Sequence, residues 1–297
     1  MALLTAQGIS RVAIQLLVRS LALPQTVTMV PGDEFSGSNG DTITVRVPQP
    51  SAARTQASAG SALTADAINE VGVDVSLSHK YHLHNITDQE LTYNIEDFAR
   101  QITLPQVQAV ALGVEDSLAS VINALGATDA TVNWDATPTE ADDVDTILRA
   151  RQFLTDNDAP PSDRYLALAP DLVTRLLKYD LLLDASQSAS DGALRDAMIG
   201  RMFGFNVIES GALDAGEAIA YHRSGLVMAV RAPLAPRGAA SSSSASAQGI
   251  GMRQVFQYDA SVASDQSLVS AFVGAAAVYE DSTGTDEARF CKIVAGT

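Results

Sequence analysis

The chain has 297 residues, with 35 acidic side chains against 19 basic ones and a formal charge of −16. Hydrophobic residues make up 46% of the sequence, which is enough for a chain of this length to bury a core in one or two domains. The single cysteine, Cys291, excludes an intrachain disulfide framework. The acidic excess argues against a protein whose main task is to grip nucleic-acid phosphates.

The first 30 residues contain an amphipathic pattern. Apolar residues recur at helical spacing from Ile9 onward, with Leu16 on the same side, and predict a helix. Two interpretations stay open, because such a helix could pack on its own domain or lie as an arm on a neighbouring subunit. The most apolar early stretch, residues 9–23, is interrupted by two arginines and is too short for a membrane span. It also lacks the charged n-region, unbroken apolar core and small-residue cleavage site that a signal peptide would have.

Two alternating segments predict an extended two-stranded arm. Residues 42–47 form one strand that ends at Pro48, and residues 71–83 alternate strictly over a longer span, with a polar, weakly hydrophobic tip between them. An isolated hairpin of this kind is marginal in water and needs another surface. Arg46 and Arg54 on this arm are either solvated charges or ion-pair partners for an acidic neighbouring subunit, and both interpretations stay open.

The rest of the chain alternates between helical and strand patterns. A capping box at 87–90 precedes a long amphipathic helix over 107–125. Helices alternate with short strands over 137–220, which predicts a compact α/β subdomain. From Ser224 onward strands return, and we expect them to pack with the long helix, whereas the serine-rich residues 233–248 are expected to form a loop.

Motifs for catalysis are missing. The sequence has no phosphate-binding loop, dinucleotide fingerprint or nucleophile elbow, so we predict no enzyme activity, no catalytic residue and no cofactor. His82 and His84 share a face of a predicted strand, but the residues around them favour a polar strand surface over a metal site. Asp142, Asp143 and Asp145 fall in the first turn of a predicted helix, where negative charge suits the helix dipole without a metal.

The order of the elements resembles the major capsid protein of tailed bacteriophages, an α+β fold of the Hong Kong 97-like type that encapsulin shells also use. Each matching stretch is a weak signal by itself, and the order of the stretches carries the resemblance. The stretches that resemble strands, turns and the spine helix of this family are 40–48, 77–97, 105–125, 161–170, 203–207 and 251–278.

The resemblance implies a division of the chain into four parts. These are an N-terminal arm (1–30), an extended loop (31–86), a peripheral domain with the spine helix (87–136 and 221–297) and an axial α/β domain (137–220). Some relatives join their subunits through a loop lysine. No lysine precedes Lys80 here, so we expect no such crosslink from the loop tip.

The function implied by the resemblance is structural. The chain would self-assemble into hexamers and pentamers of an icosahedral virion capsid around double-stranded DNA, in the host bacterial cytoplasm. Expected partners are other copies, a portal and a separate scaffolding protein, because the extended loop begins soon after residue 30; a decoration protein is left open. Arg46, Arg54, Ile9 and Leu16 are the candidate contacts between subunits. The alternatives are an encapsulin-like compartment and, less favoured, a cytoplasmic α/β enzyme.

Overall fold

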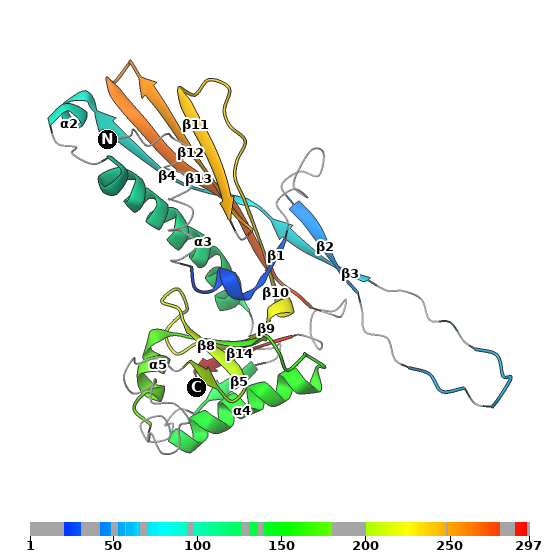
Figure 1. The fold of residues 1–297 in the computed structure, drawn as a ribbon. Helices are drawn as coiled ribbons and strands as arrows, with labels where there is room; N and C mark the ends of the chain where they lie inside the picture. The colour runs from blue at the N-terminus through cyan, green and yellow to red at the C-terminus, as the bar shows by residue number, and fades with distance from the viewer. Residues whose placement is uncertain are drawn as a thin grey trace.

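The computed structural model of the chain describes residues 21–30, 42–48, 53–56, 58–63, 65, 70–93, 98–125, 131–135, 139–179, 200–247, 249–279 and 289–295. The predicted helix that contains Ile9 and Leu16 lies outside these residues. As predicted, the described chain is α+β, with two six-stranded sheets, a two-stranded hairpin and a long helix (Figure 1).

The first sheet is built around the longest strand, β13 (Ser264–Ala277). On one side β13 pairs with β12 and then β10, and on its other side with β4, in each case antiparallel. The outer strands are β1, parallel to β10, and β11, antiparallel to β12. The bounds of these strands are β1 Thr28–Val30, β4 Ser78–Thr87, β10 Leu226–Arg231, β11 Ser241–Ala247 and β12 Ile250–Asp259.

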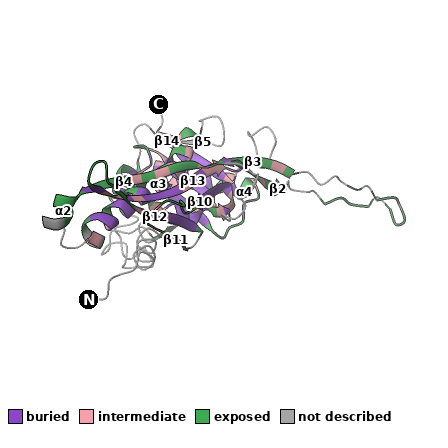
Figure 2. Cartoon of the chain, turned by 90° about the horizontal axis from the view of Figure 1, so that it is seen from above, coloured by how far each residue is buried: buried purple, intermediate pink, exposed green. Residues whose placement is uncertain are grey.

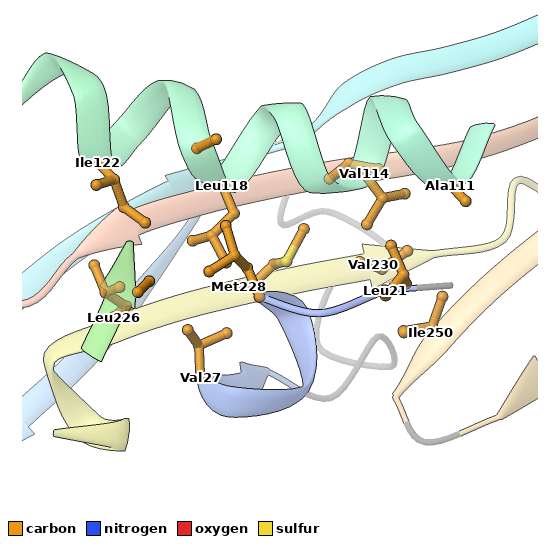
Figure 3. Packing of buried hydrophobic residues seen from close by; sticks show 14 of the residues in the cluster. Leu21, Val27, Ala111, Val114, Leu118, Ile122, Leu226, Met228, Val230 and Ile250 are labelled. Carbon is orange, nitrogen blue, oxygen red and sulfur yellow. The ribbon is translucent and has the colours of Figure 1, made fainter. Parts of the chain in front are cut away.

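A long helix, α3 (Leu104–Ala124), covers one face of the first sheet. A short helix, α2 (Asp88–Tyr93), and a π-helical turn (Ala99–Thr103) precede it. The predicted capping box forms, because Glu90 Oε2 accepts a hydrogen bond from the Thr87 backbone N–H at 2.9 Å. Every third or fourth residue of α3 is buried against the sheet and against the segment at 21–27, as Figure 3 shows for Ala111, Val114, Leu118 and Ile122.

The second sheet has the strand order β5-β14-β9-β6-β8-β7 and packs against two helices, α4 (Glu140–Asp156) and α5 (Pro170–Leu176). Ile147, Leu154 and Phe205 are fully buried in its core. Two single 3-10 turns, Pro24–Thr26 and Arg223–Gly225, lie outside the sheets. The strands are β5 Thr131–Trp134, β6 Arg164–Leu168, β7 Arg201–Met202, β8 Phe205–Glu209, β9 Ala218–His222 and β14 Phe290–Ala295.

The hairpin of β2 (Thr42–Pro48) and β3 (Glu70–Ser76) projects from the first sheet beyond the body of the molecule (Figures 1 and 2). Within the described part of the hairpin, the base is packed through a small cluster that joins Val73 and Val75 to Val227 on β10. At this crossing Gly274 of β13 touches β3 so closely that a Cβ at this position would lie under 3.0 Å from the Ser76 carbonyl oxygen. The base of the hairpin is therefore fixed by close backbone contact.

The second strand of the predicted arm, 71–83, is divided between two sheets. Its first part is β3, which pairs with β2, and the chain then changes partner at Leu77 and continues as β4 in the first sheet. The prediction of one continuous strand was wrong. A period of two residues records only which side chains share a face, and it is the same whichever strand is the partner.

Three further segments differ from the expectations. Residues 241–247, within the predicted loop 233–248, form edge strand β11 on β12. Strands β5 and β14 pair with each other and β14 pairs with β9, so both belong to the second sheet and not to the group around the long helix. Cys291 and Ile293 of β14 are buried in the core of the second sheet, whereas Phe290 packs in the cluster around α3. The four-part division of the chain stays a prediction.

Lys292 joins the second sheet to the end of α3. Its side chain is only 4% exposed, and its ammonium nitrogen lies 3.1 Å from Glu217 Oε2. It also donates hydrogen bonds to the carbonyl oxygens of Asn123 and Leu125, at 2.8 and 3.2 Å. These carbonyls end α3, so the cation sits at the negative end of the helix dipole. The buried ammonium group of Lys292 thus connects the second sheet to α3, the helix that packs on the first sheet.

Replacing this cation tests its role. Lys292→Met should lower the free energy of unfolding of the unassembled subunit by about 3 kcal/mol, because it leaves the Glu217 carboxylate and two helix carbonyls without their donor. Denaturant titration followed by circular dichroism measures the change. Adding Glu217→Gln to Lys292→Met should restore part of the loss, and wild-type stability in Lys292→Met would contradict this role.

The crossing of the hairpin over β13 gives a second test. Gly274→Ala should cost about 1–3 kcal/mol, because the added methyl group meets the backbone of β3 and not a flexible side chain. Gly211→Ala is the matched control, since a Cβ there would meet nothing within 4 Å. Equal unfolding midpoints for Gly274→Ala and the wild type would show that the crossing is looser than described.

Candidate assembly surfaces

In the described part of the chain, the histidines of β4 belong to no group of three or more metal-ligating side chains. His82 and His84 share a face, as predicted, with ring centroids 6.3 Å apart. Across the described ranges no group of three or more His, Cys, Asp or Glu side chains is arranged to hold a metal ion. Cys291 is fully buried. None of the described helices is long and apolar enough to cross a membrane.

The three aspartates of α4 have three different roles. Asp142 closes a capping box with Thr139, whose backbone N–H donates to it at 2.9 Å. Asp145 makes a surface ion pair with Arg149 at 2.7 Å. Asp143 is fully buried. Helix-dipole reasoning explains the first carboxylate, whereas the burial of Asp143 needs a partner of its own.

Asp143 is the centre of a buried polar cluster. Arg175 approaches it with Nε at 2.8 Å and Nη2 at 2.9 Å, and the Tyr179 hydroxyl donates to its second oxygen. The guanidinium carbon of Arg175 lies 5.0 Å from the centre of the buried Trp134 ring. Burial and the hydrogen bond to Asp143 raise the pKa of Tyr179 to about 12. The cluster therefore ties together α4, β5 and the residues that end and follow α5.

The two candidate contact arginines lie on the arm. Arg46 on β2 has a 79% exposed side chain and lies 3.6 Å from Glu70 of the same hairpin. Arg54 is exposed on the described part of the tip. Leu63, on the same tip, is 81% exposed. The described part of the arm thus presents both cations and a large apolar side chain. The predicted contacts with another subunit stay a prediction.

An apolar groove opens on the face of the first sheet that points away from α3. Leu83 of β4 and Val255 of β12 flank Leu268 of β13, whereas the next residue, Val269, is buried in the core beneath α3. Alternation therefore assigns the groove to the opposite face. It has a volume of about 410 Å³, and its lining is His79, Tyr81, Leu83, Val255, Gln257, Gln266 and Leu268.

This groove was not predicted from the sequence. Tyr81 and Leu83 are 63% and 45% exposed, although they alternate regularly with the polar residues of β4. The alternation predicts one strand of the arm, whose apolar side we expect to lie on another subunit. The signal that could have located the groove is the pair Leu268 and Phe272, which share the groove face of the strand that pairs with β4.

Solved structures with the same fold are phage and phage-like capsids. A structure of Mycobacterium phage Che8 matches with a TM-score of 0.65 and 18% identity, over 93% of this chain and 91% of that chain. The capsid of cyanophage P-SCSP1u matches with a TM-score of 0.64 and 14% identity, over 94% and 89%. The capsid of a native GTA particle matches with a TM-score of 0.62 and 11% identity, over 93% and 90%.

The sequence itself gives independent support. No curated protein matches it. A family model that describes phage capsid proteins does match, over residues 73–265, which is more than half of the chain. The matched stretch runs from the hairpin through α3 and the second sheet into β13. Together with the fold, this confirms the resemblance to major capsid proteins, and the chain belongs to the phage capsid protein family.

Proposed function

We propose that the chain is the repeating subunit of an icosahedral virion shell, in which hexamers and pentamers enclose double-stranded DNA. The observation that carries the proposal is the projecting hairpin, whose base is packed on its own chain and whose described tip residues are mostly exposed. A two-stranded ribbon gains stability from a surface that it can cover. In a closed shell each hairpin covers a neighbour, and every subunit is held by several modest contacts at once.

The charge balance supports a container for DNA. A net charge of −16 leaves few cations for phosphate binding, so an inner wall with this composition would repel packaged DNA and not adsorb it. The scarce arginines Arg46 and Arg54 would then serve contacts between subunits. A portal and a separate scaffolding protein are the expected partners, with assembly in the bacterial cytoplasm before the shell becomes part of the virion.

An encapsulin-like compartment is the second candidate, because the order of elements (arm, long loop, spine helix, axial insert) is shared by both kinds of shell. The two differ in their contents. A phage shell isolated from lysed cells should protect DNA from nuclease, whereas a compartment should retain a protein cargo.

Assembly is the direct test of the proposal. The full chain, expressed alone and together with the neighbouring genes, should form closed particles of megadalton mass. Electron microscopy and sedimentation velocity would measure them. Small oligomers under every condition, including co-expression with the scaffolding gene, would contradict a shell function.

The arm arginines give a variant test. Arg46→Ala combined with Arg54→Ala should change the free energy of unfolding by no more than about 1 kcal/mol, because exposed ion pairs contribute little to stability. The yield of closed particles should nevertheless fall severalfold. Arg149→Ala, which removes an exposed ion pair on α4, is the control and should assemble normally. Full assembly of the double variant would remove these arginines from the interface.

A further inference from the structure

The groove continues a surface that the chain partly covers with its own hairpin. On β13, Gly274 and Ala276 lie on the groove face and pack against β3 and its cluster. Leu268 and Phe272 lie on the same face farther along the strand, and both are only half-buried. The same apolar sheet face is therefore covered at one end and open at the other.

The tip of the hairpin carries a side chain that fits this opening. Leu63 is 81% exposed and is the one large apolar residue in the part of the tip that the structure describes, at 53–56, 58–63 and 65. The hairpin extends from the body on the side opposite α2 and the neighbouring ends of β4, β12 and β13 (Figures 1 and 2). A contact between this tip and a groove thus requires two copies of the chain.

We propose that the groove is a binding seat for Leu63 of a second copy, between Tyr81 and Leu83, and that the seat requires a neutral His79. This inference rests on the proposed shell function, since two copies must be neighbours. A leucine side chain suits a groove that is lined mainly by apolar and aromatic side chains, together with two glutamines.

His79 makes the seat sensitive to protons. Its ring stacks on Tyr81, with centroids 5.4 Å apart, and lies 5.0 Å from the Phe272 ring. Partial burial, and then the nearby Arg253 guanidinium, lower the pKa of His79 below its usual value of 6.5. A leucine seated in the groove removes more water from the imidazole, which disfavours its charged form further. Binding therefore favours neutral His79 and weakens as the pH falls through the pKa of the free subunit.

The other charged or titratable groups near His79 do not reverse the direction of this pH dependence. Strand β12 contributes Arg253, a like charge, and β13 contributes neutral or apolar side chains at this face. Tyr81 is the neighbouring titratable group on β4 itself. From β3, Asp74 lies nearest in sequence, and its carboxylate accepts a hydrogen bond from Thr44 at 2.6 Å. Across the described strands, no carboxylate lines the groove to hold a protonated imidazole.

Engineered cysteines test the contact. The native Cys291 is fully buried, so exposed thiols come only from the introduced residues. Leu63→Cys with Leu83→Cys should give a ladder of linked chains on non-reducing denaturing gels after mild oxidation of assembled particles. Leu63→Cys with Leu112→Cys is the control, because Leu112 is 64% exposed on α3, on the other side of the sheet. That pair should remain monomeric on the gel.

The outcomes separate the two proposals. If the wild-type chain forms no particles, the shell function fails. If particles form but the 63–83 pair gives no ladder, or the 63–112 pair gives one, the seat is overturned while the shell function stands. If the variant with cysteines at 63 and 83 does not assemble, the single variants Leu63→Ser and Leu83→Ser test the contact instead. Each should reduce particle yield severalfold. A wild-type yield from either variant would overturn the proposed binding of Leu63 in the groove.

The proton dependence has its own controls. Wild-type particle yield should fall severalfold between about pH 7.5 and about pH 5.5, a range that spans the titration of histidine. His79→Asn should abolish most of that dependence, whereas His82→Asn, on the opposite face of the same strand, should retain it. Equal pH profiles for the wild type and His79→Asn would overturn the role of His79.

Discussion

The subunit depends on one strand that packs against other parts of the chain on both of its faces. Strand β13 has fourteen residues, and its sequence is rich in alanine, serine and glycine. One face carries Val269, Ala271 and Val273 into the core beneath α3. The other face passes from the groove to the crossing of β3. Small side chains are needed at that crossing because the backbone of the hairpin approaches so closely.

The direction of the arm follows from this constraint. Because β13 holds β4 along its edge and β3 across its face, the chain must leave one and enter the other within two residues around Leu77. The position of the second sheet relative to α3 is also fixed, by two side-chain contacts. Glu115 in the middle of α3 accepts a hydrogen bond from the Ser210 hydroxyl at 2.9 Å, and Lys292 holds the end of the same helix. Arm, helix and second sheet are thus fixed to one frame.

Local signals in the sequence were sufficient for local structure. The capping box at Thr87 and the apolar period of the long helix predicted elements that the structure contains. Pairing between strands that are distant in the sequence was harder to predict. The serine-rich edge strand β11 has no alternation to reveal it, and the partner change at Leu77 leaves the period of two intact.

The same limit applied to buried charges. A helical period places Asp143 on the face of Ile147 and Leu154, which indicates burial, but nothing nearby in the sequence identifies Arg175 as its partner, 32 residues away. Candidate contact residues were therefore found only where they were conspicuous. Arg46 and Arg54 stood out on a segment with little to bury, whereas Tyr81 and Leu83 were hidden in a regular strand pattern.

The burial of Lys292 also determines how the protein can be labelled. The sequence contains three lysines, and the other two differ in access: Lys80 is half-buried, with its aliphatic stem lying over Gly113, whereas Lys178 is exposed just before Tyr179. Amine-reactive dyes or cross-linkers would thus modify the chain chiefly at Lys178, apart from its N-terminal amine. Such a label would lie just after the end of α5 in the second-sheet domain. Its yield on an intact particle would show whether this part of the subunit is exposed to solvent there.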